Sequence, residues 1–481
     1  MRLVTSGTKS EIVCSLAAML VVSAVVLAGA AAPSILNATS SDHVDASTPH
    51  KWSEAPSMLL PRSSPAVVIL EDGNIFVIGG LAQDGPTSTT EIFNVSSREW
   101  EPGPRLLYAR LGHTATLLDD GTVLVTGGET GEGATASAEI VNLTLGASVF
   151  APSMYFARAA HSATKLANGH VLVTGGTDWS TGTRKEAETY DPVNHTWAPA
   201  GNMAAPRVFF SLHTLTDGRA VAVAGDSEGT SELYDPVTNK WSGTANMSSN
   251  RYNIGSVFLS DGRVLVAGGV YNGTTMNTCE LYDPATNQWD AAANMTTPRA
   301  QFSLSQMPNG TVLAAGSWSG LGTTASSELF MPAEGAWKDA GSMNHSRGAH
   351  GAAALSNGMV FVIGGISSGK QTSSVEVYSV VPLEPDEKCM PIDLLPLVLA
   401  VAPELPGHSE NGLAAKLYAA QAQYDAGEYA VCIDIMNAFY HQTKALWQSG
   451  HLGDAGASVL YVGYADVVSC MGGLPLSAIP F

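Results

Sequence analysis

Three histidines recur at one spacing and could share a metal ion. His113, His161 and His350 each follow an Arg by three residues, and neutral imidazole is a common metal ligand. The four equivalent positions carry other residues, namely Pro65, Phe210, Ile254 and Phe302. No symmetric site can therefore form, and we expect these histidines to order the turns in which they lie.

Arginine and glutamate recur more regularly still. Each of seven Args is followed ten residues later by Asp-Gly or Asn-Gly, seventeen residues later by Gly-Gly or a near relative, and then by a Glu. The Args are Arg62, Arg110, Arg158, Arg207, Arg251, Arg299 and Arg347, and the Glus are Glu91, Glu139, Glu188, Glu232, Glu280, Glu328 and Glu376. Because both types occur in every copy, we expect them to pair within the scaffold rather than to contact a ligand.

The elements that carry these residues are short strands. The period is about 48 residues, and the second copy divides into four β runs, called here strands a to d: His113–Leu118, Val123–Thr126, Ala138–Asn142 and Ser148–Pro152. Asx-Gly suits the a–b hairpin because Gly accepts a positive φ. The apolar strand b predicts burial on both faces. A period of this length, built of short strands, indicates an all-β propeller of seven blades.

Tryptophans show how the ring closes. A Trp follows the Glu by nine residues in five copies, and the second copy is irregular, with Phe150 eleven residues on. No Trp follows Glu376, yet Trp52 precedes Arg62 by ten residues, the usual interval. We therefore expect an N-terminal strand at His50–Ala55 to complete the seventh blade beside Ser374–Val380. An open ring would leave sheet edges exposed.

The order Arg, Gly-Gly, Glu-X-Tyr-Asp and Trp resembles the kelch repeat family over residues 50–380. Kelch propellers serve mainly as binding platforms for proteins or carbohydrates, and a minority are enzymes, so the resemblance leaves the function open. The loops here are short and uniform, whereas enzymes on this scaffold build pockets from long individual loops. We expect a non-catalytic binding protein with no cofactor and no metal. The alternative is a carbohydrate-active enzyme, of sugar oxidase or epimerase type, that uses the central pocket.

The oxidase alternative can be tested on the cysteines. A copper-radical oxidase joins a Cys to a Tyr and adds another Tyr and two His as metal ligands. The only Cys in the propeller is Cys279, where other copies have the small residues Thr90, Ala138, Ser231 and Ser327. We therefore expect a buried packing thiol.

Aromatic residues near the Gly doublets are the better candidates for ligand contacts. Trp179, Tyr271 and Trp318 lie in predicted b–c loops, where they could stack on sugar rings or anchor a protein partner. Packing against the next blade is the alternative. Asp178 and Arg184 lie near Trp179 in sequence and complete the predicted contacts.

The N-terminus and the sequons indicate export. Arg2 and Lys9 precede an apolar run, so residues 1–32 are predicted to be a signal peptide or an N-terminal membrane anchor, followed by a linker at 33–49. Nine Asn-X-Ser/Thr triplets occur, against about three or four expected by chance. Besides Asn37 they are Asn94, Asn142, Asn194, Asn246, Asn272, Asn294, Asn309 and Asn344, all in predicted turns and predicted to be glycosylated. We expect an extracellular protein, secreted or attached to the cell surface.

The net charge and the sequon positions restrict which partners the protein can bind and where they can dock. A net charge of −20 argues against nucleic acid or an anionic membrane surface, which need a basic footprint, and leaves a cell-surface or extracellular protein or glycan. On the face shared by the b–c and d–a loops, the sequons all lie from blade 4 onward. Blades 1 to 3 thus leave a sector of that face free of glycans, and we expect partners to dock there. This sector contains Asp84, Glu129, Glu132, Asp178, Trp179, Arg184 and Lys185.

The repeat ends near Val380. Residues 381–390 read as a linker, and residues 391–481 change to a helical period, which predicts a small α-helical bundle. The stretches 413–417 and 437–439 resemble the FIMAH domain. That module occurs at the C-termini of exported prokaryotic proteins, and the resemblance implies surface association.

Two cysteines of the predicted bundle are placed to pair. Cys432 lies nineteen residues before His451, and Cys470 nineteen residues after it. In an antiparallel helix pair they would meet at one end, which predicts a disulfide in an exported protein. Cys389 should reach the same end and could compete.

Overall fold

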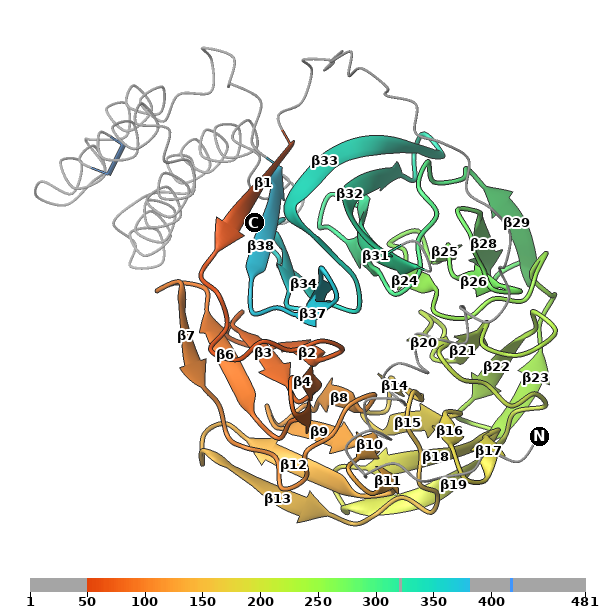
Figure 1. Cartoon of the computed structure of the whole chain (residues 1–481). Coiled ribbons are helices and arrows are strands. Elements are labelled where there is room, and N and C mark those ends of the chain that lie inside the picture. The colour runs from red at the N-terminus through yellow and green to blue at the C-terminus, as the bar shows by residue number, and fades with distance from the viewer. Residues whose placement is uncertain (1–49, 320–321, 381–415, 418–481) are drawn as a thin grey trace, which may run out of the picture. The chain divides into compact units, whose positions relative to one another are not determined.

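The computed structural model describes residues 50–319, 322–380 and 416–417. Seven four-stranded antiparallel sheets are arranged around a central axis, as the blades of a β-propeller (Figure 1). The predicted signal or anchor segment, both linkers, Asn37, Cys389, Cys432, Cys470 and almost all of the predicted helical bundle lie outside the described residues. None of the described residues forms a helix long and apolar enough to cross a membrane.

Each of the first three blades runs from an inner strand a to an outer strand d. Blade 1 contains β2 (Ala66–Ile69), β3 (Ile75–Ile78), β6 (Thr90–Asn94) and β7 (Glu99–Pro102). Blade 2 contains β8 (Thr114–Leu117), β9 (Val123–Thr126), β12 (Ala138–Asn142) and β13 (Ala147–Ala151). Blade 3 contains β14 (Ser162–Lys165), β15 (Val171–Thr174), β18 (Glu186–Asp191) and β19 (Thr196–Asn202). The four strands predicted for the second copy are confirmed to within one residue at each end.

Blades 4 to 6 repeat this order. Blade 4 contains β20 (Ser211–Thr214), β21 (Ala220–Val223), β22 (Ser231–Asp235) and β23 (Lys240–Gly243). Blade 5 contains β24 (Gly255–Phe258), β25 (Val264–Ala267), β28 (Cys279–Asp283) and β29 (Gln288–Ala292). Blade 6 contains β30 (Ser303–Gln306) and three longer strands, β31 (Val312–Ser319), β32 (Gly322–Met331) and β33 (Ala336–Arg347).

Blade 7 joins the two ends of the propeller. Its strands are β34 (Gly351–Ala354), β35 (Val360–Ile363) and β38 (Val375–Val380), with β1 (His50–Ala55) beside β38 as the outermost strand (Figure 1). The indole of Trp52 donates to Ser327 Oγ at 2.9 Å, and its ring centroid lies 5.3 Å from that of Tyr378. The predicted closure by an N-terminal strand is confirmed.

The core lies between neighbouring blades. All four residues of the b strand are buried in blades 1 to 5 and 7, and the first six residues of the longer β31 are buried in blade 6, as the run of apolar residues predicts. Phe76 and Ile78 of blade 1, for example, pack in one cluster with Val123 and Val125 of blade 2. Each interface is therefore a separate hydrophobic layer, repeated around the ring.

The b–c loops form two-stranded ribbons on one face. Five blades have them: β4–β5 (Leu81–Ala82, Gly85–Pro86), β10–β11 (Glu129–Thr130, Gly133–Ala134), β16–β17 (Thr177–Asp178, Gly182–Thr183), β26–β27 (Val270–Tyr271, Thr274–Thr275) and β36–β37 (Ile366–Ser367, Lys370–Gln371). In blade 6 the main strands β31 and β32 extend through this region. In blade 4 the loop is shorter and no ribbon pairs there.

An inner ring of backbone hydrogen bonds links the blades. The residue two positions after each repeated Arg has a positive φ, between 48° and 62°: Ser64, Gly112, Ala160, Phe209, Asn253, Gln301 and Ala349. At six of the seven junctions its N–H donates to the carbonyl of the same residue in the preceding blade, as from Ala160 to Gly112 and from Ser64 to Ala349. The strained backbone is thus held by the ring that it forms.

Blade 2 departs from the other blades at its outer edge. Elsewhere an aromatic residue on strand c pairs with the strand d Trp, for example Tyr190 with Trp197 at 5.1 Å between ring centroids. In blade 2 the same register pairs Val141 with Ser148. Ser148 thus holds the Trp position, and Phe150 lies two residues beyond it, opposite Glu139.

Candidate functional site

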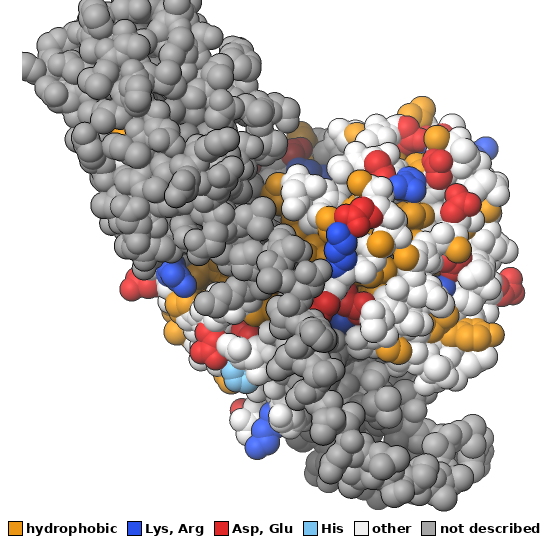
Figure 2. All heavy atoms as spheres, turned by 90° about the horizontal axis from the view of Figure 1, so that it is seen from above, with side chains coloured by type: hydrophobic (Ala, Val, Ile, Leu, Met, Phe, Trp, Pro, Cys, Tyr) orange, Lys and Arg blue, Asp and Glu red, His pale blue; other side chains and the backbone are white. Residues whose placement is uncertain are grey.

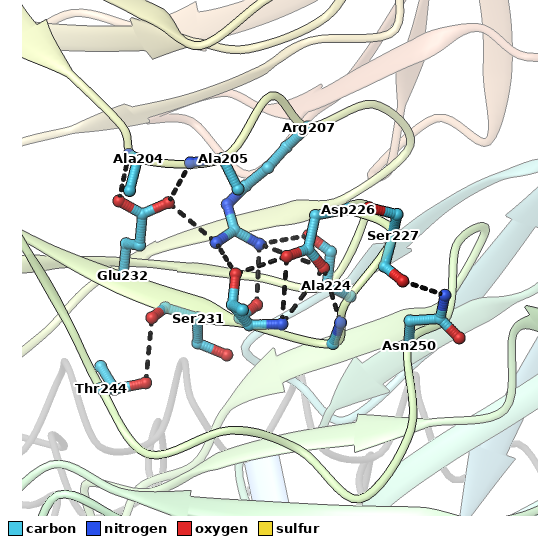
Figure 3. A network of polar contacts seen from close by, with 12 residues as sticks. Ala204, Ala205, Arg207, Ala224, Asp226, Ser227, Ser231, Glu232, Thr244 and Asn250 are labelled. Atoms are coloured by element: carbon cyan, nitrogen blue, oxygen red, sulfur yellow. Dashed lines mark hydrogen bonds and ion pairs between the residues drawn. The ribbon is translucent and has the colours of Figure 1, made fainter.

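Each repeated Arg is buried and holds its own blade together. In blade 4 the Arg207 guanidinium donates to the carbonyls of Ala224 and Thr230 at 2.8 and 2.7 Å and contacts Glu232 at 2.9 Å (Figure 3). Glu232 also accepts the N–H groups of Ala204 and Ala205. The carboxylate therefore organises the d–a loop as well as the cation.

The backbone of the same Arg contacts the preceding blade. Arg207 N–H donates to the Arg184 carbonyl at 3.0 Å, and its own carbonyl accepts from Gly176 N–H at 2.8 Å. All seven Arg–Glu pairs lie between 2.5 and 2.9 Å, with side chains at most 7% exposed. The expectation that these residues pair within the scaffold is confirmed.

Blade 4 replaces the ribbon with an acidic cap. The side chain of Asp226 accepts hydrogen bonds from the N–H groups of Gly229 and Thr230, and lies 3.8 Å from Arg207 (Figure 3). Its partners all belong to its own loop and the adjacent Arg. We assign it a structural role.

The histidines are wedges between blades. His161 Nε2 lies 3.0 Å from Thr114 Oγ1 of blade 2, and His350 Nε2 lies 2.9 Å from Ser303 Oγ of blade 6. A Cβ added to Gly79 would come within 2.6 Å of His113 Cε1, and one added to Gly175 within 2.6 Å of Phe210 Cε1. His113 and Phe210 therefore fill the same slot in different blades.

Burial keeps these histidines neutral. It lowers the pKa of His113 and of His350 to about 3, helped by the nearby Arg110 and Arg347. In the described part of the chain, no three His, Cys, Asp or Glu side chains are grouped so that they could hold a metal ion. The wedge role explains why Phe can replace His at this position.

Cys279 is a packing thiol, as predicted. It is 2% exposed, and its Sγ lies 3.6 Å from the Asn277 carbonyl. Burial raises its pKa to about 11, so the nucleophilic thiolate is scarce at neutral pH.

Of the predicted ligand contacts, the structure brings three together on the ribbon of blade 3. Trp179 lies in the turn between the two strands of this ribbon and is 43% exposed. Asp178 and Arg184 form a partly buried ion pair at 3.3 Å, and Asp178 also accepts from Ser180. Arg184 Nε donates to the Ala157 carbonyl at 2.7 Å. The pair thus braces the ribbon and leaves part of the Trp179 ring exposed.

Glu129 joins this cluster from the ribbon of blade 2. It is buried, and one carboxylate oxygen has no hydrogen-bond partner among the described residues. Burial raises its pKa, the charge of Asp178 adds to that rise, and a hydrogen bond from the Trp179 indole opposes it. Glu129 was predicted only as a member of the glycan-free sector, because its contact with Trp179 crosses from one ribbon to the next.

Tyr271 and Trp318 belong to other blades and do not join the cluster. Tyr271 is 40% exposed on the ribbon of blade 5. Trp318 is half-buried, and its Cβ and backbone nitrogen lie close to Gly348 in the next d–a loop. For both residues a ligand contact stays a prediction.

Most of the predicted glycosylation sites are exposed. Six Asn residues are exposed, namely Asn194, Asn246, Asn272, Asn294, Asn309 and Asn344. Asn94 and Asn142 are half-buried, and their side-chain oxygens accept N–H groups of their own turns. Glycosylation itself remains a prediction.

Exposed apolar side chains concentrate at blade 2. Of the thirteen large exposed hydrophobic residues described, seven lie on its outer strand or in the turns and loops beside it. We call these seven the blade 2 rim: Leu107, Tyr108, Leu145, Val149, Phe150, Tyr155 and Phe156. By contrast, hydrophobic and charged side chains are interspersed on the side of the molecule seen in Figure 2. The pattern of the repeat does not predict this rim; only a comparison of equivalent positions between blades would have found it.

Comparison with known proteins supports the fold. The Kelch motif matches residues 61–107, 255–296 and 347–381. No curated protein matches the chain. Among solved structures, a novel fungal alcohol oxidase of the AA5 family, in complex with copper, is similar with a TM-score of 0.60 and 17% identity, over 69% of this chain and 77% of that one.

At that identity the likeness concerns the fold alone. The described residues do not fit a copper centre, because the three wedge histidines lie in separate blade interfaces and the Cys279 thiol is packed against backbone. The chain carries kelch motifs and folds as a seven-bladed β-propeller.

Proposed function

We propose that this chain is an exported, non-catalytic recognition protein that binds a protein or glycan ligand at the cell surface through the ribbons of blades 2 and 3. The exposed indole of Trp179, which hydrogen-bonds to Glu129 and follows Asp178 of the Asp178–Arg184 pair, carries the proposal. An indole face flanked by carboxylates suits an apolar surface that also has hydrogen-bond donors, as on a sugar ring or a side chain of a protein.

Two features support recognition rather than turnover. The repeated Arg and Glu residues and the wedge histidines are all engaged inside the scaffold. One cavity among the described residues, of about 440 Å³, lies at the a–b turns of blades 5 to 7 and is lined by Ser260, Gln306, Met307, Pro308, Gly310, Ala354, Leu355 and Ser356. These residues include no acid, base or thiol for general acid–base or nucleophilic catalysis.

Export rests on the sequence: the charged and apolar N-terminus and the nine sequons. The sequons of blades 4 to 7 on the ribbon face would keep ligands toward blades 1 to 3. Glycan occupancy can be measured by mass spectrometry of the protein from its native host.

The test is a glycan array and a panel of extracellular proteins, probed with the purified protein beside a sugar-oxidase assay with and without copper. We expect binding that falls in Trp179→Ala and stays unchanged in Val237→Ala, a 92% exposed apolar residue on a c–d turn. Turnover in the oxidase assay would refute the proposal, as would binding that Trp179→Ala leaves intact.

A further inference from the structure

The outer strand of blade 2 is an unprotected sheet edge. β13 is the last strand of its sheet. Its sequence, Ala-Ser-Val-Phe-Ala, has no charged residue and no proline, whereas each of the other six outer strands contains at least one. Charges and prolines are how sheet proteins prevent their edges from pairing with other chains.

The pairing of strand d with strand c shows which residues of the seven outer strands occupy equivalent positions. Val149 and Phe150 lie opposite Ile140 and Glu139. The equivalent pairs in the other blades with recorded register are Glu101-Pro102, Ala198-Pro199, Ser242-Gly243, Asp290-Ala291 and Lys338-Asp339. Blade 2 alone has two large apolar residues here, and they are 54% and 61% exposed.

The backbone of β13 offers hydrogen bonds outward. Proline, which has no N–H, occupies the Phe150 position in blades 1 and 3, so the N–H there is not needed to pair with strand c. The Phe150 N–H therefore points away from its sheet. Among the described residues, no backbone hydrogen bond joins the outer side of β13 to another segment.

The side chains beside this edge form an exposed apolar surface. The rings of Tyr108 and Phe150 lie 5.6 Å apart between centroids. The Tyr155 hydroxyl donates to the Trp197 carbonyl of blade 3 at 3.2 Å, which fixes that ring at the far side of the rim. Aromatic rings of this kind pack well against the alternate side chains of an extended chain.

We propose that the blade 2 rim binds an extended segment of a partner protein, which adds as a fifth strand to the free edge of β13. This goes beyond the proposed recognition function, because it assigns a second binding surface, separate from the ribbons of blades 2 and 3, and names a polypeptide as its partner. The edge presents N–H and C=O groups in the alternating order that another strand complements, and Val149 and Phe150 provide apolar contacts. A second copy of this chain is the less favourable occupant, because each copy carries a net charge of −20.

The probe is a fluorescein-labelled peptide, Lys-Thr-Val-Thr-Val-Thr-Val-Lys, titrated into the full chain produced without glycans, because the predicted glycosylation site Asn142 lies opposite the first residue of β13, and followed by fluorescence anisotropy. We expect binding that weakens at least about tenfold in Phe150→Pro, which removes the outward N–H. The variant should fold, because blades 1 and 3 carry proline at this position. Gly243→Pro, at the matched position of blade 4, should leave the affinity unchanged.

Three outcomes would overturn the inference. They are no binding to the natural chain, equal binding to Phe150→Pro, and equal binding of a peptide N-methylated at its valines. A dimer seen by sedimentation and lost in Phe150→Pro would make a second copy the occupant instead. Trp179→Ala should not change peptide binding, so array binding without peptide binding would sink this inference and leave the proposed function standing.

Discussion

Acid should destabilise the propeller through its wedge histidines. Burial holds the pKa of His113 at about 3 in the folded state, against an ordinary value of 6.5. Below pH 6.5 the unfolded chain therefore binds a proton that the folded chain does not, and stability falls as the pH falls toward 3. At pH 5, 1.5 units below 6.5, the loss is about 2 kcal/mol for each such histidine, at about 1.4 kcal/mol per pH unit. His350 should contribute similarly.

The variant His113→Phe isolates this effect. Phe210 fills the equivalent slot of another blade, so the substitution follows a packing that the fold already uses. Urea unfolding, followed by tryptophan fluorescence at pH 7 and pH 5, gives the loss of unfolding free energy for each chain. We expect the variant to lose about 2 kcal/mol less than the natural protein, or ~0.7 M in urea midpoint for an m value of ~3 kcal/mol per M.

The reverse variant, Phe210→His, is the matched control and should add a similar loss at pH 5. This pH window lies above the ordinary pKa of carboxyl groups, so few of them titrate within it. If His113→Phe loses as much stability as the natural protein between pH 7 and pH 5, the wedge reasoning is wrong.

Two further predictions concern the scaffold. Arg110→Met should lower the free energy of unfolding by about 3–5 kcal/mol, because Glu139 stays buried without its cation; the double variant with Glu139→Gln should recover part of it, and a loss under 1 kcal/mol in urea would contradict this. Trp52→Ala should cost about 3–5 kcal/mol in the same assay, because the closing strand loses its contact with Tyr378. An unchanged melting temperature would show that β1 does not secure the ring.

The sequence predicts the scaffold well because each repeated residue makes the same contacts within its own blade. The Arg–Glu pairs, the buried b strands and the closure by Trp52 follow from spacing that seven copies share. A search for an aromatic residue in place of the missing Trp of blade 2 finds Phe150, which is the wrong position. The Trp of five other blades follows the Glu by nine residues, and nine residues after Glu139 is Ser148. The strand pairing confirms that Ser148 occupies the Trp position.

The candidate sites are less predictable, because they depend on contacts between copies. Glu129 meets Trp179 across two ribbons, and no spacing within one repeat encodes that meeting. Trp318, like Trp179, follows the Gly doublet of its blade, yet it lies on a main strand beside Gly348, since blade 6 extends its main strands instead of forming a separate ribbon. The blade 2 rim differs from the other blades because its outer strand lacks the charged residues and prolines that the other outer strands carry. This difference can be seen only when the outer strands are aligned.

The inner ring of backbone hydrogen bonds has an electrostatic consequence. Amides beside left-handed residues often converge to form an anion-binding nest. Here six such N–H groups point along the circumference, each toward the next carbonyl, as from Ala349 to Gln301. Dipoles arranged head to tail around a circle cancel as vectors, so this ring adds almost no field along the central axis. Each of these amides already donates to a carbonyl of the neighbouring blade, so the ring offers them to no anionic ligand.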